Sequence, residues 1–113
     1  MNIVILRGTL SSDPVCRTLA SGSLLVSLEL TTVAGGASLS VPVAWFDPPS
    51  EVAWVAGEPL VVIGTVRRRF FRTGGLTQSR TEVVAAEVVP AARRRHVRAA
   101  LARAALSVQP AAA

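Results

Sequence analysis

The 113-residue chain has no tyrosine, no lysine, one cysteine, one histidine and only five aromatic side chains. A single cysteine, Cys16, excludes an intramolecular disulfide and a CxxC zinc-ligand pair. The one histidine, His96, lies in an arginine run with no second metal ligand nearby. A glycine-rich phosphate loop and clustered carboxylates are also missing, so the sequence gives no support to catalysis. We therefore expect neither an enzyme nor a cofactor.

Long hydrophobic runs are absent as well. The longest, such as Ile3–Leu6 and Leu60–Ile63, are far shorter than the roughly 20 residues that a membrane span requires. The first residues lack the charged and apolar regions of a signal peptide, and strand-like alternation begins almost at once. With 50% hydrophobic residues, the chain can fold as one domain. We expect a cytoplasmic, nucleoid-associated protein with no membrane partner.

Positive charge is concentrated in the second half of the chain. All twelve basic residues are arginine. Residues 1–64 hold two arginines and five acidic residues, a net charge of −3, whereas residues 65–113 hold ten arginines against Glu82 and Glu87, a net charge of +8. This asymmetry indicates a polyanionic partner, with nucleic acid the first candidate and an anionic membrane surface the second.

The pattern of apolar residues and turn signals predicts a mostly β protein. We expect strands near 3–10, 24–32 and 38–46, a short helix over Glu51–Val55, a long hairpin of Leu60–Phe71 with Leu76–Val89, and a helix over Ala91–Leu106. This order predicts an all-β fold: a five-stranded OB-fold Greek-key barrel with a short helix between strands 3 and 4 and a C-terminal helical extension. The predicted domains are residues 1–90, the barrel, and 91–113, an Arg/Ala-rich helix with a frayed end.

The most informative segment is the basic strand that follows Gly64. Because side chains alternate along a strand, Arg67, Arg69 and Phe71 should share one face. Val66, Arg68 and Phe70 should share the other, where we expect Phe70 to pack in the core. Cations interleaved with an aromatic ring are what a protein needs to hold the backbone and stack the bases of a single strand. An ordinary solvated edge strand is the alternative.

Short motifs in order along residues 2–90 resemble the bacterial single-stranded DNA-binding protein family. They are Asn2–Leu10, Asp13-Pro14 with Arg17, Val43–Trp45, Gly57, Val61–Gly64 with the Arg67/Arg69 strand, and Thr81–Ala85. The resemblance implies an OB-fold that binds single-stranded DNA without sequence preference and protects it during replication, recombination or repair. It further implies a homo-oligomer, with a tetramer favoured and a dimer as the alternative.

The resemblance also implies two base-stacking positions, Trp45 and Phe71. Strand alternation alone does not decide whether Trp45 lies in the core or on the DNA face. Arg72 and Arg80 flank the hairpin turn and would extend the track of cations, while Arg7 and Arg17 are weaker candidates. The predicted DNA-binding set is Trp45, Arg67, Arg69, Phe71, Arg72 and Arg80.

Three departures from the family pattern bear on function. The Val33–Ser38 connection is short, few aromatic residues are available, and the chain ends in an Arg/Ala segment where relatives carry an acidic, Phe-tipped peptide. We therefore expect a weaker or smaller site, no recruitment of repair enzymes through an acidic tail, and a specialised paralogue. Arg93–Arg95 is either a solvated helix start or a second phosphate contact. The alternative functions are an OB-fold primosomal protein and an adaptor acting through protein contacts.

Overall fold

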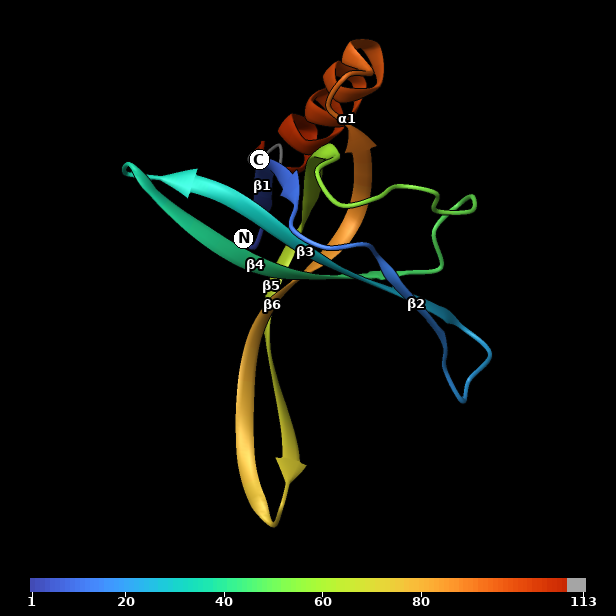
Figure 1. Cartoon of the computed structure of the whole chain (residues 1–113). Coiled ribbons are helices and arrows are strands. Elements are labelled where there is room, and N and C mark those ends of the chain that lie inside the picture. Colours follow the sequence, from blue (N-terminus) through green and yellow to red (C-terminus); the bar gives the residue numbers. More distant parts are fainter. Residues whose placement is uncertain (110–113) are drawn as a thin grey trace.

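Six strands and one helix make up the computed structural model, which describes residues 1–109 (Figure 1). The elements are β1 (Val4–Leu10), β2 (Val15–Thr18), β3 (Leu24–Ala34), β4 (Ala37–Phe46), β5 (Pro59–Thr73), β6 (Leu76–Pro90) and α1 (Arg94–Ser107). The predicted all-β character is confirmed, as is a C-terminal helix. The expected frayed end falls partly on residues 110–113, which lie outside the described residues.

The strands form one sheet that closes on itself. Its order is β1-β5-β6-β4-β3-β2, and β1 also pairs with β3 through Thr9 and Leu10, which completes the ring. Neighbouring strands are antiparallel except β4 and β6, which run parallel where Val43 and Ala44 meet Val83 and Val84. Strand β2 is added beside β3 at the edge.

The core lies inside this ring. Alternate residues of the strands point inward, and the most completely buried side chains are Leu10, Val26, Leu30, Leu60 and Val62. Gly8 and Gly64 allow backbones to approach closely, because a Cβ at either position would overlap a carbonyl oxygen of the neighbouring strand, that of Thr31 or Val84. A register shift interrupts the β5–β6 ladder at Ile63/Gly64, where the sheet bends.

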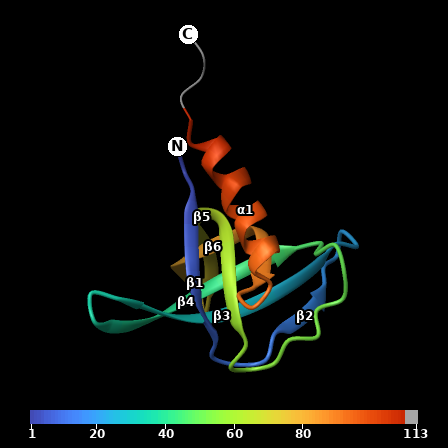
Figure 2. The same ribbon diagram turned by 90° about the horizontal axis from the view of Figure 1, so that it is seen from above.

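Two hairpins extend beyond the ring. The β3–β4 hairpin turns at Gly35-Gly36 and the β5–β6 hairpin at Gly74-Gly75, all four glycines having positive φ. Figure 1 shows the β5–β6 hairpin leaving the body on the side opposite α1. The helix packs Ala100 and Ala104 against Ile63, so that it covers one end of the ring (Figure 2).

The predicted short helix over Glu51–Val55 is wrong: residues 48–58 have no helical turn. Five residues are too few for helix nucleation without tertiary support, and the segment is instead held by distant partners. The Ala56 N–H donates to Asp13 Oδ1 at 2.7 Å, and the Gly57 N–H donates to the Leu10 carbonyl at 2.7 Å. Within residues 1–109, no helix has the length and apolar character to cross a membrane.

Candidate nucleic-acid interface

A groove crosses the outer face of β3 and β4, between the β1–β3 connection and the base of the β5–β6 hairpin. Its volume is about 530 Å³. The connection, which includes β2, provides Arg17, and the hairpin base provides Arg67, Arg69 and Arg80. Apolar side chains form much of the floor and walls, among them Val15, Leu19, Leu25, Pro42 and Phe46. The groove therefore combines arginine side chains with an apolar surface.

Glu82 organises the arginines at the hairpin base. Its Oε1 accepts hydrogen bonds from Arg67 Nε (3.2 Å), Arg67 Nη2 (3.1 Å) and Arg69 Nε (3.1 Å). The residue is 7% exposed, whereas the Arg67 and Arg69 side chains are 43% and 47% exposed. Since a guanidinium has five N–H donors, both arginines keep donors for an outside ligand. Two cations on one carboxylate leave this cluster with a net charge of about +1.

An aromatic ring lies beside each of these guanidiniums. Arg67 Cζ lies 5.5 Å from the centroid of the Phe46 ring, and Arg69 Cζ lies 5.4 Å from that of Phe71. These separations are within the range of cation–π contacts. The result is a row in the order Phe46, Arg67, Glu82, Arg69, Phe71, which we call the Arg–aromatic row. It places Arg67, Arg69 and Phe71 together, as the alternation predicted.

Arg80 also faces the groove, but it is paired. Its Nη2 lies 2.7 Å from Glu29 Oε1. Arg80 stands directly opposite Arg69 in the β5–β6 ladder, an unfavourable position for two like charges. Glu29 and Glu82, one for each arginine, offset that repulsion. Of the two weaker sequence candidates, Arg17 lines the groove without an ion pair among residues 1–109, whereas Arg7 does not line it.

Arg72 does not extend the row. By strand alternation it lies on the opposite face of β5 from Arg69 and Phe71. Its Nη2 donates to the Gly75 carbonyl at 3.2 Å, which ties the side chain to the hairpin turn. We therefore leave Arg72 out of the candidate interface.

Trp45 is buried in the core rather than placed on the groove. It is 7% exposed and stacks on Trp54, with ring centroids 5.8 Å apart and planes inclined by 2°. Its neighbour Phe46 points the other way and lines the groove. Adjacent residues of a strand point to opposite faces of the sheet. The alternation Val41, Val43, Trp45 was the signal in the sequence that could have identified Phe46.

The expectation that Phe70 packs in the core is wrong. Phe70 is 67% exposed, because this part of β5 lies in the projecting hairpin, where neither face meets the core. Val66, on the same face, is 43% exposed. Face alternation was therefore predictable from the sequence, but the point at which β5 leaves the ring was not.

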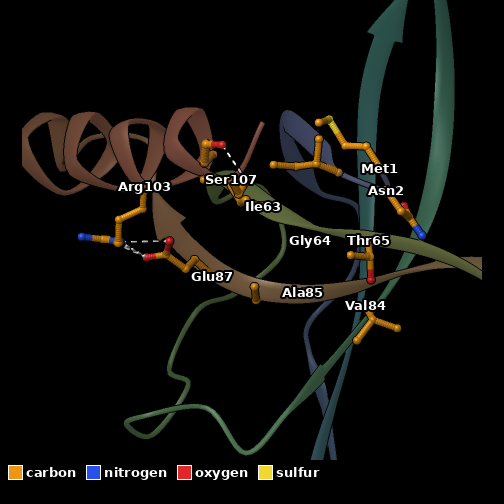
Figure 3. Close-up of a pocket in the computed structure, with 13 residues that line it drawn as sticks. Met1, Asn2, Ile63, Gly64, Thr65, Val84, Ala85, Glu87, Arg103 and Ser107 are labelled. Carbon is orange, nitrogen blue, oxygen red and sulfur yellow. Dashed lines mark hydrogen bonds and ion pairs between the residues drawn. The ribbon is translucent and has the colours of Figure 1, made fainter. Parts of the chain in front are cut away.

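A larger hollow of about 670 Å³ lies between α1, the first residues and the β5–β6 bulge (Figure 3). Apolar side chains such as Ile3, Ile63 and Ala104 line much of it. Its charged side chains, Arg103 and Glu87, bind each other, with Nη2 and Oε1 2.6 Å apart. The hydrogen bonds to Glu87 raise the pKa of the Arg103 guanidinium. This ion pair also links α1 to β6. An apolar hollow whose charges are paired in this way does not suit a phosphate backbone.

Comparison with known proteins gives no match to any family model or any curated protein.

Proposed function

We propose that this protein binds single-stranded DNA, without sequence preference, in the groove and along the Arg–aromatic row, which continues from the groove to Phe71 on the hairpin. The row is the observation that supports the proposal: two half-buried rings flank two guanidiniums that share one buried carboxylate. Aromatic faces stack on any base and guanidiniums bind any phosphate, so such a surface does not distinguish sequences. Stacking needs unpaired bases, which favours single strands over duplex.

The fold supports the same proposal. Around the ring the strands follow the order β1-β3-β4-β6-β5, and we propose that this is an OB-fold barrel with β2 as an added edge strand. OB-folds bind oligonucleotides on the face of their second and third strands and on two flanking loops. In this chain those strands are β3 and β4, and the loops are the β1–β3 connection and the β5–β6 hairpin. All four line the groove.

In the cell we propose that the protein covers and protects single strands exposed during replication, recombination or repair, within the nucleoid. The arginines at the groove are partly neutralised by Glu82 and Glu29, so the net positive charge is smaller than their number suggests. Single-strand binding contributes a salt slope of about −0.7 for each phosphate neutralised. A groove that engages one or two phosphates gives a slope of about −0.7 to −1.4.

The test is a titration of oligo-dT with the whole chain, repeated from about 0.02 to 0.3 M salt, a range over which phosphate contacts are screened out. We expect affinity to fall with salt, and single-stranded oligo-dT to bind more tightly than a duplex of equal length. Salt-independent binding would contradict a role for the arginines. Equal affinity for the duplex would contradict base stacking.

We also propose that the chain self-associates, and an adaptor role through protein contacts is the second candidate. The observation that favours both is the number of large apolar side chains exposed outside the core. Ile5 is 51% exposed on the outer face of β1, and Val33, Phe70 and Leu76 are exposed on the projecting hairpins. Covering such side chains with a second chain would remove apolar surface from water, which favours association.

A further inference from the structure

The outer edge of β5 is unpaired along the projecting part of the β5–β6 hairpin. Strand β1 pairs with β5 only as far as Val4 and Gly64, and the next contact comes from a side chain. Asn2 Nδ2 donates to the Val66 carbonyl at 2.8 Å, and the Val66 N–H donates to Asn2 Oδ1 at 3.0 Å. Beyond this contact the hairpin projects from the body (Figure 1), and no strand of residues 1–109 pairs with β5 on that side.

The backbone of this edge points outward at every second residue. In an antiparallel strand the N–H and C=O of one residue point to the same side, and the side alternates along the chain. Since both groups of Val66 face Asn2 rather than β6, those of Arg68, Phe70 and Arg72 face the same open side. The register with β6 has no shift between here and the turn, so the alternation is kept. The edge therefore offers unpaired donors and acceptors, which are a template for an added strand.

The side chains of these three residues share the face of the hairpin that looks away from the Arg–aromatic row. The exposed Phe70 ring lies between two exposed guanidiniums. Opposite them on β6 are only hydroxyl residues, Thr77, Ser79 and Thr81. Neither Arg68 nor Arg72 has an ion pair in the described part of the chain, and the hydrogen bond from Arg72 to the turn leaves most of its N–H donors free. An added strand therefore meets a cation, an apolar ring and a second cation at alternate positions.

We propose that this edge binds an extended segment of a partner protein, which adds a strand to β5 and carries an acidic, an apolar and an acidic residue at alternate positions. Main-chain hydrogen bonds give such a complex affinity, and the alternate side chains give it specificity. Opposite charges that face each other across a strand pair are stabilising. A second copy pairing through the same edge fits less well, because it brings two further arginines and no acidic residue. A nucleic acid lacks the peptide groups that pair with a strand edge.

This inference goes beyond single-strand binding and does not depend on it. Because side chains alternate along β5, the residues of the edge and those of the Arg–aromatic row lie on opposite faces of one hairpin. A peptide and a DNA strand can therefore be bound at the same time. The edge thus gives the adaptor role a surface and a partner of defined chemistry.

The test uses the whole chain and two labelled peptides of the same composition, each flanked by glycines. In Glu-Thr-Phe-Thr-Glu, both acidic side chains share the face of the phenylalanine when the peptide is extended, whereas in Thr-Glu-Phe-Glu-Thr they lie on the other face. We expect the first peptide to bind more tightly in a fluorescence anisotropy titration. Equal binding of the two peptides, or no binding of the first, would overturn the proposal.

A pair of variants separates the edge from overall charge. Arg68→Gln/Arg72→Gln should weaken binding of the first peptide roughly 5-fold, the combined effect of two opposite-charge pairs across strands. The matched control Arg94→Gln/Arg98→Gln removes the same charge from α1 and should lose much less affinity. Equal losses in the two variants would mean that the peptide responds only to net charge, and that result contradicts a site at the edge.

Hydrogen exchange measured by NMR gives a readout that charge attraction alone does not change. The bound peptide should slow exchange of the Arg68, Phe70 and Arg72 amides, whereas the amides of the residues between them, which face β6, should change little. Absence of this alternating protection would show that no strand is added. The same protection in the protein alone, growing with its concentration, would assign the edge to a second copy. Either result would overturn the proposal.

Oligo-dT distinguishes a failure of this inference from a failure of the proposed function. Saturating oligo-dT should leave the first peptide bound, and displacement of the peptide would assign the edge to DNA and overturn the proposal. If oligo-dT does not bind while the peptide protects the edge, the proposed function is wrong and the inference stands. If oligo-dT binds and the peptide does not, only the inference is wrong.

Discussion

Glu82 is the residue on which the charge of the interface depends. It is buried, and one of its oxygens accepts all three hydrogen bonds from Arg67 and Arg69. A phosphate that approaches the row must therefore compete with, or share donors with, this carboxylate. Removing either arginine would leave the carboxylate less well compensated, which is costly for a buried charge. Glu82 thus fixes the geometry of the row and limits its net charge at the same time.

Replacing Glu82 with glutamine should tighten binding of oligo-dT at low salt. The amide keeps an acceptor oxygen for the guanidiniums but removes the negative charge, so the row can neutralise one further phosphate. We expect the salt slope to become steeper by about 0.7. Glu87→Gln is the control, because that carboxylate pairs with Arg103 away from the groove. Weaker binding by Glu82→Gln with an unchanged slope would show that the carboxylate acts only by orienting the arginines.

At the residue scale the sequence predicted part of the candidate interface. Alternation was enough to group Arg67, Arg69 and Phe71, because it depends only on the strand period. It could not identify Glu82, which stands opposite Arg67 only once β5 and β6 are paired in register. It also favoured neither face for Trp45, and the resemblance pointed to Trp45, which is buried, rather than to Phe46, which lines the groove. Residues brought together by strand pairing were the ones that sequence reasoning missed.

Among the elements, the β5–β6 hairpin connects the ring to the proposed binding surface. Its first part belongs to the ring, its middle carries the row, and its tip extends beyond both. The bend that makes this possible lies at Gly64, where the ladder shifts register and the backbone of β6 comes very close. The position of the row relative to β3 and β4 depends on this close approach.

A Gly64→Ala change should lower the free energy of unfolding by about 1–3 kcal/mol, the usual cost of forcing extra atoms into a filled space. The added Cβ would overlap the Val84 carbonyl oxygen, so the strands must separate. Thr65→Ala, at the exposed next position, should change stability by less than about 0.5 kcal/mol. Denaturant unfolding of the two variants measures the difference. Equal stabilities would mean that the strands separate there without cost.

The elements were predictable where local signals were strong. Diglycine turns marked both hairpins, and the alanine- and arginine-rich segment marked α1. The 47–58 loop was not predictable, because its backbone is held by Asp13 and Leu10, far away in the sequence. The register shift at Gly64 likewise arises from packing rather than from local preference.

On the scale of the whole molecule, the exposed apolar side chains predict self-association. Light scattering should give a mass that is a multiple of the single-chain mass, with a tetramer or a dimer as the expected state. Ile5→Glu should reduce that mass, because it places a charge on the outer face of β1. Val55→Glu, in the exposed 47–58 loop, serves as the control. A single-chain mass for the unaltered protein at all concentrations would contradict self-association.

The core, the groove and the helix occupy separate parts of the molecule. The ring holds the core, the groove lies on its outer face, and α1 covers one end while the β5–β6 hairpin leaves on the other side (Figures 1 and 2). Phe70 and Phe71 are adjacent on the projecting part of that hairpin, but they point to opposite faces. They therefore provide a matched pair that separates stacking on the Arg–aromatic row from general effects on the hairpin.

The central claim is tested most directly by oligo-dT binding to Phe71→Ala and Phe70→Ala. Removing the ring beside Arg69 should weaken binding by about 1–3 kcal/mol, the usual contribution of one stacked base. Removing Phe70, which faces away from the row, should leave the affinity unchanged within about 0.5 kcal/mol. Unchanged affinity in Phe71→Ala, or an equal loss in both variants, would contradict single-strand binding by the Arg–aromatic row.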